Sequence, residues 1–191
     1  MASIVENRSI NGIGLPPAGA YAFDKSHTTL GFVARHMLSK VHGRFTEFDG
    51  EVTVGEDIED SSVTLEIKAT SVNTDSDQRD GHLRSDDFLD VENYPSLTFD
   101  STALRVGEGS SFELDGRLTI KDVTRPVTLR GEFLGSGPDM RGGTLAAFSA
   151  HTTIEREDWD LTWNVAVETG GFLVGKKVDI VLDVELQLQE G

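Results

Sequence analysis

Histidine is the residue type in this chain best suited to acid–base or metal chemistry. Five histidines occur beside 33 aspartate and glutamate residues, and cysteine is absent. An imidazole near a carboxylate can transfer protons or ligate a metal ion. However, the sequence has no H-E-x-x-H motif, no pair of histidines at helical spacing and no group of three histidines. We therefore predict no catalytic residue, no metal site and no cofactor.

Two histidines are candidates for polar groups at the rim of a binding cavity. His27 precedes a predicted strand, and His36 lies on the same strand face as apolar residues. The alternative for His36 is a hydrogen bond to backbone inside a strand core. His42 and His151 are expected to be structural or exposed.

A charged connector over residues 79–102 interrupts the apolar segments, and it offers two further polar candidates. Arg79 and His82 could donate to a carboxylate or pyrophosphate head group, because a guanidinium forms two parallel hydrogen bonds to such anions. The alternative is that Arg79 forms salt bridges with nearby aspartates and holds the connector to the rest of the fold. The segment 75–81 resembles the start of an EF-hand, but Asp86 replaces the expected glutamate and flanking helices are absent, so we reject calcium.

The same connector is predicted to contain one or two short helical turns. Asp80 or Ser85 could act as the N-cap, because a short side-chain oxygen accepts from the free N–H groups of a first turn. Pro95 ends these turns, and a strand is predicted over Ser96–Leu104.

Elsewhere the apolar residues mostly alternate with polar ones, which is typical of strands with one buried face. The clearest example is Val178–Leu188, and a long strand is predicted over Val41–Val54. Some eight antiparallel strands without a long amphipathic helix indicate an all-β sandwich or barrel. Closure into an extended eight-stranded antiparallel barrel would remove exposed edges, with the helical turns following the fourth or fifth strand. Such a barrel is wide enough for one small ligand.

Large apolar residues on the buried faces would line this cavity, and small residues such as Gly116 and Gly131 would leave room beside them. Ordinary core packing is the alternative for each large residue. The predicted lining is Phe32, Ala34, Phe45, Leu65, Ile67, Phe99, Leu118, Phe148, Trp163 and Phe172.

Length and composition favour one soluble domain. We expect a flexible N-terminal tail over residues 1–18 and a single β-barrel domain over 19–190. The formal net charge of −16 disfavours nucleic acid and anionic membranes as partners. No signal peptide and no membrane-spanning run is recognised, so a cytoplasmic location without membrane insertion is expected.

Several motifs, taken together and in this order, resemble the YceI-like family from about residue 20 onward. The resemblance implies a lipocalin-like barrel that binds a polyisoprenoid or a fatty-acid-like amphiphile inside, commonly as a homodimer. Leu89-Asp90-Val91 departs from the family's more aromatic run. The matching motifs are FDKSHT (23–28), FVARHM (32–37), VHGRF (41–45), RDGHL (79–83), DF (87–88), YPSLTF (94–99), GRLTI (116–120), FSA (148–150) and IEREDW (154–159).

We therefore expect a non-enzymatic protein for the binding, transport or storage of a long-chain amphiphile. One alternative is an enzyme acting on a small hydrophobic substrate with His27, His36 or His82 as acid or base. A second is a stress-related interaction protein with a filled interior and no ligand.

Overall fold

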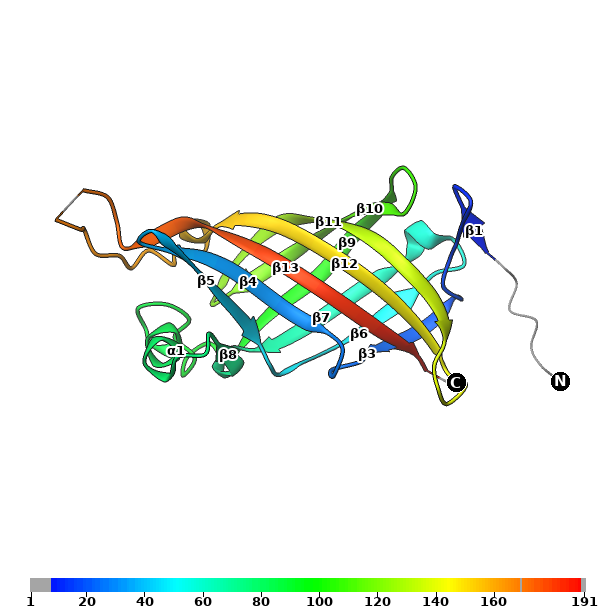
Figure 1. Ribbon diagram of the computed structural model, residues 1–191, viewed down its shortest axis with the longest axis horizontal. Coiled ribbons are helices and arrows are strands. Elements are labelled where there is room, and N and C mark those ends of the chain that lie inside the picture. The colour runs from blue at the N-terminus through cyan, green and yellow to red at the C-terminus, as the bar shows by residue number, and fades with distance from the viewer. Residues whose placement is uncertain (1–7, 169, 190–191) are drawn as a thin grey trace.

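The structure, a computed structural model, describes residues 8–168 and 170–189. These residues form an all-β fold around one large antiparallel sheet that curls into a closed barrel (Figure 1). The strands of this sheet are β3 (Gly19–Phe23), β4 (Thr29–His36), β5 (Ser39–Phe45), β6 (Phe48–Val54), β7 (Ser62–Lys68), β8 (Val72–Asn73), β9 (Ser96–Val106), β10 (Ser111–Ile120), β11 (Val123–Pro138), β12 (Thr144–Glu155) and β13 (Val174–Leu188).

Three pairs of strands lie end to end, which reduces these segments to eight positions around the barrel. β3 and β4 both pair with β13, at successive parts of its length. β5 pairs with β4 and β6 pairs with β3, so β5 and β6 share the next position. β8 pairs with β5 and β7 pairs with β6, so β7 and β8 share the one after that. Pairing of β12 with β13 closes the sheet, as predicted from the alternation pattern.

The predicted continuous strand over Val41–Val54 is wrong, because the backbone leaves the ladder at Thr46 and Glu47. There the Thr46 N–H donates to the carbonyl of Ser71 at 3.2 Å, and the Glu47 carbonyl accepts from the backbone N–H of Lys68 at 2.9 Å. These hydrogen bonds to a neighbouring turn replace strand pairing and separate β5 from β6.

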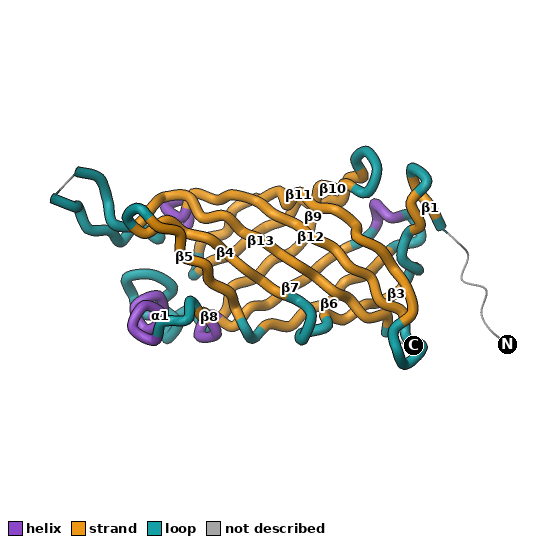
Figure 2. Tube along the Cα trace, in the orientation of Figure 1, coloured by secondary structure: helices purple, strands orange, loops and turns teal. Residues whose placement is uncertain are grey.

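Helical structure is confined to short segments, coloured purple in Figure 2. A bilayer-spanning helix is not found in the described part of the chain. The predicted helical turns are confirmed as α1, which follows β7 and β8, the fifth and sixth strand segments of the large sheet. The segments are α1 (Asp77–Arg84) and the 3₁₀ turns η1 (Ile58–Asp60), η2 (Ala69–Ser71) and η3 (Arg156–Trp159).

The predicted N-caps of α1 are both wrong. Ser76 holds the N-cap position, while Ser85 follows the last helical residue as the C-cap. Asp80 is buried within the helix, and its carboxylate accepts from the backbone N–H of Thr74 at 2.8 Å and from the Thr74 hydroxyl. This carboxylate therefore ties α1 to the end of β8 instead of starting a helical turn.

Part of the N-terminal segment has secondary structure. Residues 1–7 of the expected tail lie outside the described residues, as does residue 190 at the end of the expected domain. From residue 8 the chain forms a small hairpin of β1 (Ser9–Ile10) and β2 (Ile13–Gly14). The Arg8 guanidinium donates to the carbonyls of Gly55 and Glu56, each at 2.6 Å. The hairpin lies at the end of the barrel opposite α1 (Figure 1).

Candidate functional site

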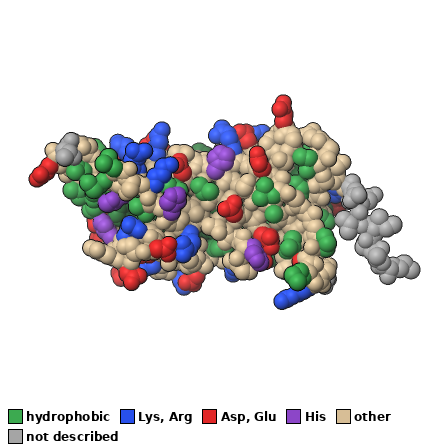
Figure 3. Space-filling model, viewed as in Figure 1, with side chains coloured by type: hydrophobic (Ala, Val, Ile, Leu, Met, Phe, Trp, Pro, Cys, Tyr) green, Lys and Arg blue, Asp and Glu red, His purple; other side chains and the backbone are tan. Residues whose placement is uncertain are grey.

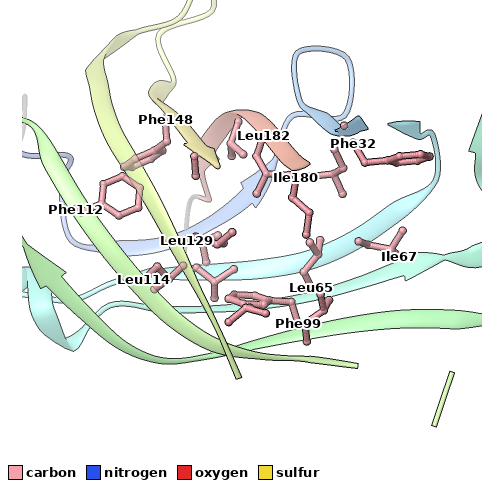
Figure 4. Close-up of a pocket in the computed structure, with 18 of the residues that line it drawn as sticks. Phe32, Leu65, Ile67, Phe99, Phe112, Leu114, Leu129, Phe148, Ile180 and Leu182 are labelled. Carbon is pink, nitrogen blue, oxygen red and sulfur yellow. The ribbon is translucent and has the colours of Figure 1, made fainter. Parts of the chain in front are cut away.

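An apolar cavity of about 370 Å³ runs inside the barrel. This volume lies near the lower end of the range of roughly 300–1,000 Å³ that is usual for small-molecule sites. The wall is built from inward-facing residues of strands on all sides, as Figure 4 shows for Phe99 and Leu65 on one side and Ile180 and Leu182 on the other. Alternation along each strand explains this arrangement, because every second side chain points inward.

Most of the large residues predicted to line the cavity do lie on its wall, and their part in ligand binding stays a prediction. Strands far apart in the sequence supply them, which reflects the closure of the sheet. The eight lining residues from that prediction are Phe32, Ala34, Phe45, Leu65, Ile67, Phe99, Leu118 and Phe148.

The placement of Trp163 and Phe172 on the cavity wall is wrong. Both belong to the connection between η3 and β13, which extends away from the barrel (Figure 1). Phe172 is 62% exposed. The Trp163 ring packs edge-on against His82, with ring centroids 4.4 Å apart, and lies 5.4 Å from Phe88. The alternation rule fails here because this connection is not part of the barrel wall.

The predicted polar mouth is not formed by Arg79 and His82. Neither side chain lines the cavity. The Arg79 guanidinium donates to the hydroxyl and the carbonyl of Thr74, both at 2.7 Å, so it holds α1 in place through hydrogen bonds. His82 Nε2 lies 2.8 Å from a carboxylate oxygen of Asp87. The connector does contribute to the cavity lining at one end, but with the apolar side chains of Leu83, Phe88 and Leu89.

His27 and His36 also lie outside the cavity lining. His27 is on the outer surface, where its Nδ1 is 3.0 Å from a carboxylate oxygen of Asp24. His36 is the last residue of β4 and faces Ser39 across the hairpin, where the barrel wall ends. The sequence pattern correctly placed both histidines beside strands, but it gave no information about where the cavity stops.

The sequence analysis missed the residues that line the opposite end of the cavity. The β1–β2 hairpin and the residues after it contribute Ile10, Ile13, Leu15 and Pro16 to the cavity lining. The apolar character of these residues was visible in the sequence. Their position at the end of the barrel could not be predicted, because it depends on the hydrogen bonds of Arg8 to the carbonyls of Gly55 and Glu56, just after β6.

The sequence analysis also missed Arg156, which is the charged residue among the described residues that line the cavity. It is only 3% exposed, and no ion pair joins it to a carboxylate in the described part of the chain. Instead the guanidinium donates to the backbone carbonyls of Gly175 at 2.9 Å, of Leu161, and of Val174 at 3.5 Å. Burial lowers the pKa of Arg156. These bonds fasten η3 to the start of β13, which makes Arg156 a structural clamp at one cavity end.

Three phenyl rings lie over glycines on neighbouring strands, which keeps the rings close to the wall. Phe32 covers Gly43, and a Cβ at that glycine would overlap the ring. The other two pairs are Phe99 with Gly116 and Phe112 with Gly131. Small residues were expected to leave room in the interior, and the structure shows how they do so. Each glycine accommodates a ring that would otherwise occupy the interior.

The lining determines what the cavity can do chemically. No histidine and no carboxylate is present on the wall that the described residues form. Burial of apolar surface is worth roughly 25 cal/mol per Å². The cavity is therefore suited to hold an apolar chain, and its wall lacks a proton-transferring pair.

A closed antiparallel barrel around an apolar cavity defines a lipocalin-like barrel. Residues 21–186 match the model of the YceI-like domain. The chain therefore belongs to the YceI-like family.

Similar proteins support this assignment over nearly the whole chain. The protein YceI of Escherichia coli is 36% identical over 176 residues, covering 90% of this chain and 88% of the relative. A UPF0312 protein of Ectopseudomonas mendocina is 33% identical over 190 residues, covering 97% and 95%. Among solved structures, a polyisoprenoid binding domain from Saccharophagus degradans matches with a TM-score of 0.65 at 18% identity, covering 88% of this chain and 98% of that one.

Proposed function

We propose that this protein binds a single long-chain amphiphile of the polyisoprenoid class inside its barrel, and that it carries or stores this lipid without acting as an enzyme. The observation that supports the proposal most directly is the apolar cavity of about 370 Å³, with apolar side chains in its lining at both ends of the barrel. This volume lies within the usual range for a small-molecule site. The Saccharophagus domain named for polyisoprenoid binding has the same fold.

The two alternative functions have less support. A histidine acid or base would have to reach the substrate, but none of the five histidines lies on the cavity wall. A ligand-free interaction protein would be expected to fill its own interior, whereas this barrel leaves a cavity.

Extraction of the purified protein tests the proposal. The protein is prepared without added lipid and extracted with organic solvent, and the extract is analysed by mass spectrometry. Binding of an added prenyl alcohol is then measured by isothermal titration calorimetry. We expect a co-purified long-chain lipid, or stoichiometric binding of the prenyl alcohol. If neither is found, the proposal is wrong.

Two neighbouring residues of β13 provide a matched pair of variants. Ile180 points into the cavity, and Val181 points outward and is exposed. Ile180→Trp should fill part of the cavity and weaken lipid binding by more than about tenfold, since overpacking leaves no room for the chain. Val181→Trp adds the same ring outside and should leave binding unchanged. Equal affinities in the two variants would place the ligand somewhere other than the barrel interior.

A further inference from the structure

A cluster of three metal-ligating side chains lies on the outside of the barrel, apart from the lipid cavity. Asp24 and His27 belong to the connection between β3 and β4, and Glu185 belongs to β13, which runs beside that connection (Figure 1). One ligand atom from each side chain lies within 4.8 Å of the other two. Asp24 and Glu185 are half-buried, so the cluster is a shallow site that the surrounding backbone supports.

The distances in this cluster match those between ligands of a tetrahedral ion. Zinc bonds to imidazole nitrogen and carboxylate oxygen are about 2.0–2.2 Å, so two ligands of a tetrahedral zinc ion lie about 3.3–3.6 Å apart. His27 Nδ1 is 3.0 Å from the Asp24 oxygen and 3.5 Å from the Glu185 oxygen. The two carboxylate oxygens lie within 4.8 Å of each other, so all three ligand atoms are close enough together to face one ion.

Hydrogen bonds from neighbouring groups orient these ligands. One oxygen of Asp24 accepts from the backbone N–H and the hydroxyl of Ser26, at 2.9 and 2.6 Å. The other oxygen is the one that faces His27. Outer hydrogen bonds of this kind orient the ligands of known metal sites.

The backbone of Glu185 is also held in place. Its carbonyl accepts from the backbone N–H of Asp24 at 2.9 Å and from the Thr28 hydroxyl at 3.1 Å, and its N–H donates to the same hydroxyl at 3.1 Å. Both segments that supply ligands are therefore fixed to each other before any ion binds. A site that is organised in advance loses less conformational entropy on binding.

The charges favour a divalent cation. When His27 is neutral, the two carboxylates place two negative charges beside one imidazole nitrogen. Aspartate and glutamate side chains are ordinarily ionised at neutral pH. The combination of one nitrogen and two oxygen ligands is suited to zinc and other first-row transition metals, whereas calcium and magnesium prefer oxygen ligands.

We infer that Asp24, His27 and Glu185 form a surface site for a zinc-type divalent cation, with water completing the coordination. The ion would join the β3–β4 connection to β13 and stabilise the folded barrel. The inference is independent of the proposed lipid function, because these side chains face outward. The sequence analysis predicted no metal site because it found no histidine motif for one, and Glu185 is remote in sequence from the other two residues.

Calorimetric titration of the full chain, without a polyhistidine tag, with Zn²⁺ at pH 7.5 tests this inference. We expect one ion to bind per chain. His27→Ala should weaken binding by more than about tenfold, because it removes one of three ligands. With free Zn²⁺ at about 100 times its Kd, the wild-type Tm should rise by about 5 to 10 °C, and this rise should be lost in the variant.

His82→Ala is the matched control, since His82 pairs with Asp87 at 2.8 Å on the surface but belongs to no three-ligand cluster among the described residues. This variant should bind zinc as the wild type does. Glu185→Gln provides a second test if His27→Ala fails to fold, as judged by circular dichroism. No binding by the wild-type protein, unchanged binding after loss of His27 or Glu185, or an equal loss in His82→Ala would overturn the inference.

The pH dependence gives a further readout. A proton and the metal ion compete for the same imidazole nitrogen of His27. The zinc affinity should therefore fall as the pH is lowered through the range in which an imidazole takes up a proton, by up to about tenfold per pH unit. A zinc affinity that does not change over this range would contradict ligation by His27.

Discussion

The phenyl ring of Phe32 lies directly over Gly43, its partner on the neighbouring strand. The three atoms nearest to a Cβ built at Gly43 all belong to this ring, so the absence of a side chain at position 43 allows the ring to lie there. Phe32 also packs against Phe45, with ring centroids 5.8 Å apart. The width of the cavity at this level therefore depends on a glycine.

Gly43→Ala should force the Phe32 ring off the wall. Overpacking of this kind typically costs about 1–3 kcal/mol, and we expect a loss of that size in the free energy of unfolding, measured with urea. Ligand affinity should fall as well. The double variant Gly43→Ala with Phe32→Leu should recover part of both losses, because the smaller side chain leaves space for the new methyl group.

Gly81→Ala is the control for this substitution. Gly81 lies within α1, and a Cβ there would meet no atom within 4 Å. Alanine is favoured over glycine in a helix by about 1 kcal/mol, so this variant should be slightly more stable than the wild type. Equal destabilisation by both substitutions would show that the Phe32 ring does not depend on Gly43.

Arg156→Ala should destabilise the barrel strongly. The substitution leaves the carbonyls of Gly175 and Leu161 without their buried donor, and hydrogen bonds to a charged group are worth about 1.5–3 kcal/mol each. We expect a loss of about 3–5 kcal/mol in urea unfolding. Arg125→Ala removes an exposed guanidinium that contacts only the carbonyl of the preceding residue, and should change the stability by less than about 0.5 kcal/mol.

Asp80→Ala should loosen α1 from the barrel. Thr74 would lose the partner of its backbone N–H and of its hydroxyl in a buried position, at a cost of about 2 kcal/mol or more. Asp77→Ala, an exposed change in the first turn of the same helix, should cost less than about 1 kcal/mol. Similar unfolding midpoints for the two variants would show that the Asp80 carboxylate does not hold the helix.

Asp115 should contribute to the acid sensitivity of the protein. Hydrogen bonds from Arg105 and Thr128 lower its pKa to about 2, below the ordinary value of 3.8. A lowered pKa in the folded state stabilises the protein at pH values above the ordinary pKa, and this contribution disappears as the pH falls towards 2.

Asp115→Asn should therefore lower the Tm at pH 6. The difference from the wild type should shrink between about pH 4 and pH 2, because the wild-type carboxylate becomes protonated there. Thermal unfolding followed by circular dichroism across this range measures both values. A difference that stays constant down to pH 2 would mean that the ionised carboxylate does not stabilise the fold.

The alternation of apolar and polar residues was enough to predict most of the strands and many of the residues that line the cavity. Alternation along Val178–Leu188 and Thr144–Glu155 shows which side chains share a face, because successive residues of a strand point to opposite sides. Phe148 and Leu65 could therefore be assigned to the interior from the sequence.

Features at the ends of the barrel depended on contacts between distant segments. Trp163 and Phe172 are large and apolar, yet their connection leaves the wall, and local periodicity does not report where a wall ends. Arg8 joins the N-terminal hairpin to the carbonyls of Gly55 and Glu56, which are remote from it in sequence. No sequence pattern near residue 8 could indicate these contacts.

The sequence by itself thus determined an all-β fold whose strands each have an apolar face, because the two-residue repeat is a local property. Only the tertiary structure decided that these faces enclose a cavity. Only the tertiary structure decided that Arg156 meets the carbonyls of β13 and that Glu185 meets Asp24 and His27. The second meeting arises because pairing of β13 with β3 and β4 brings together residues from opposite ends of the chain.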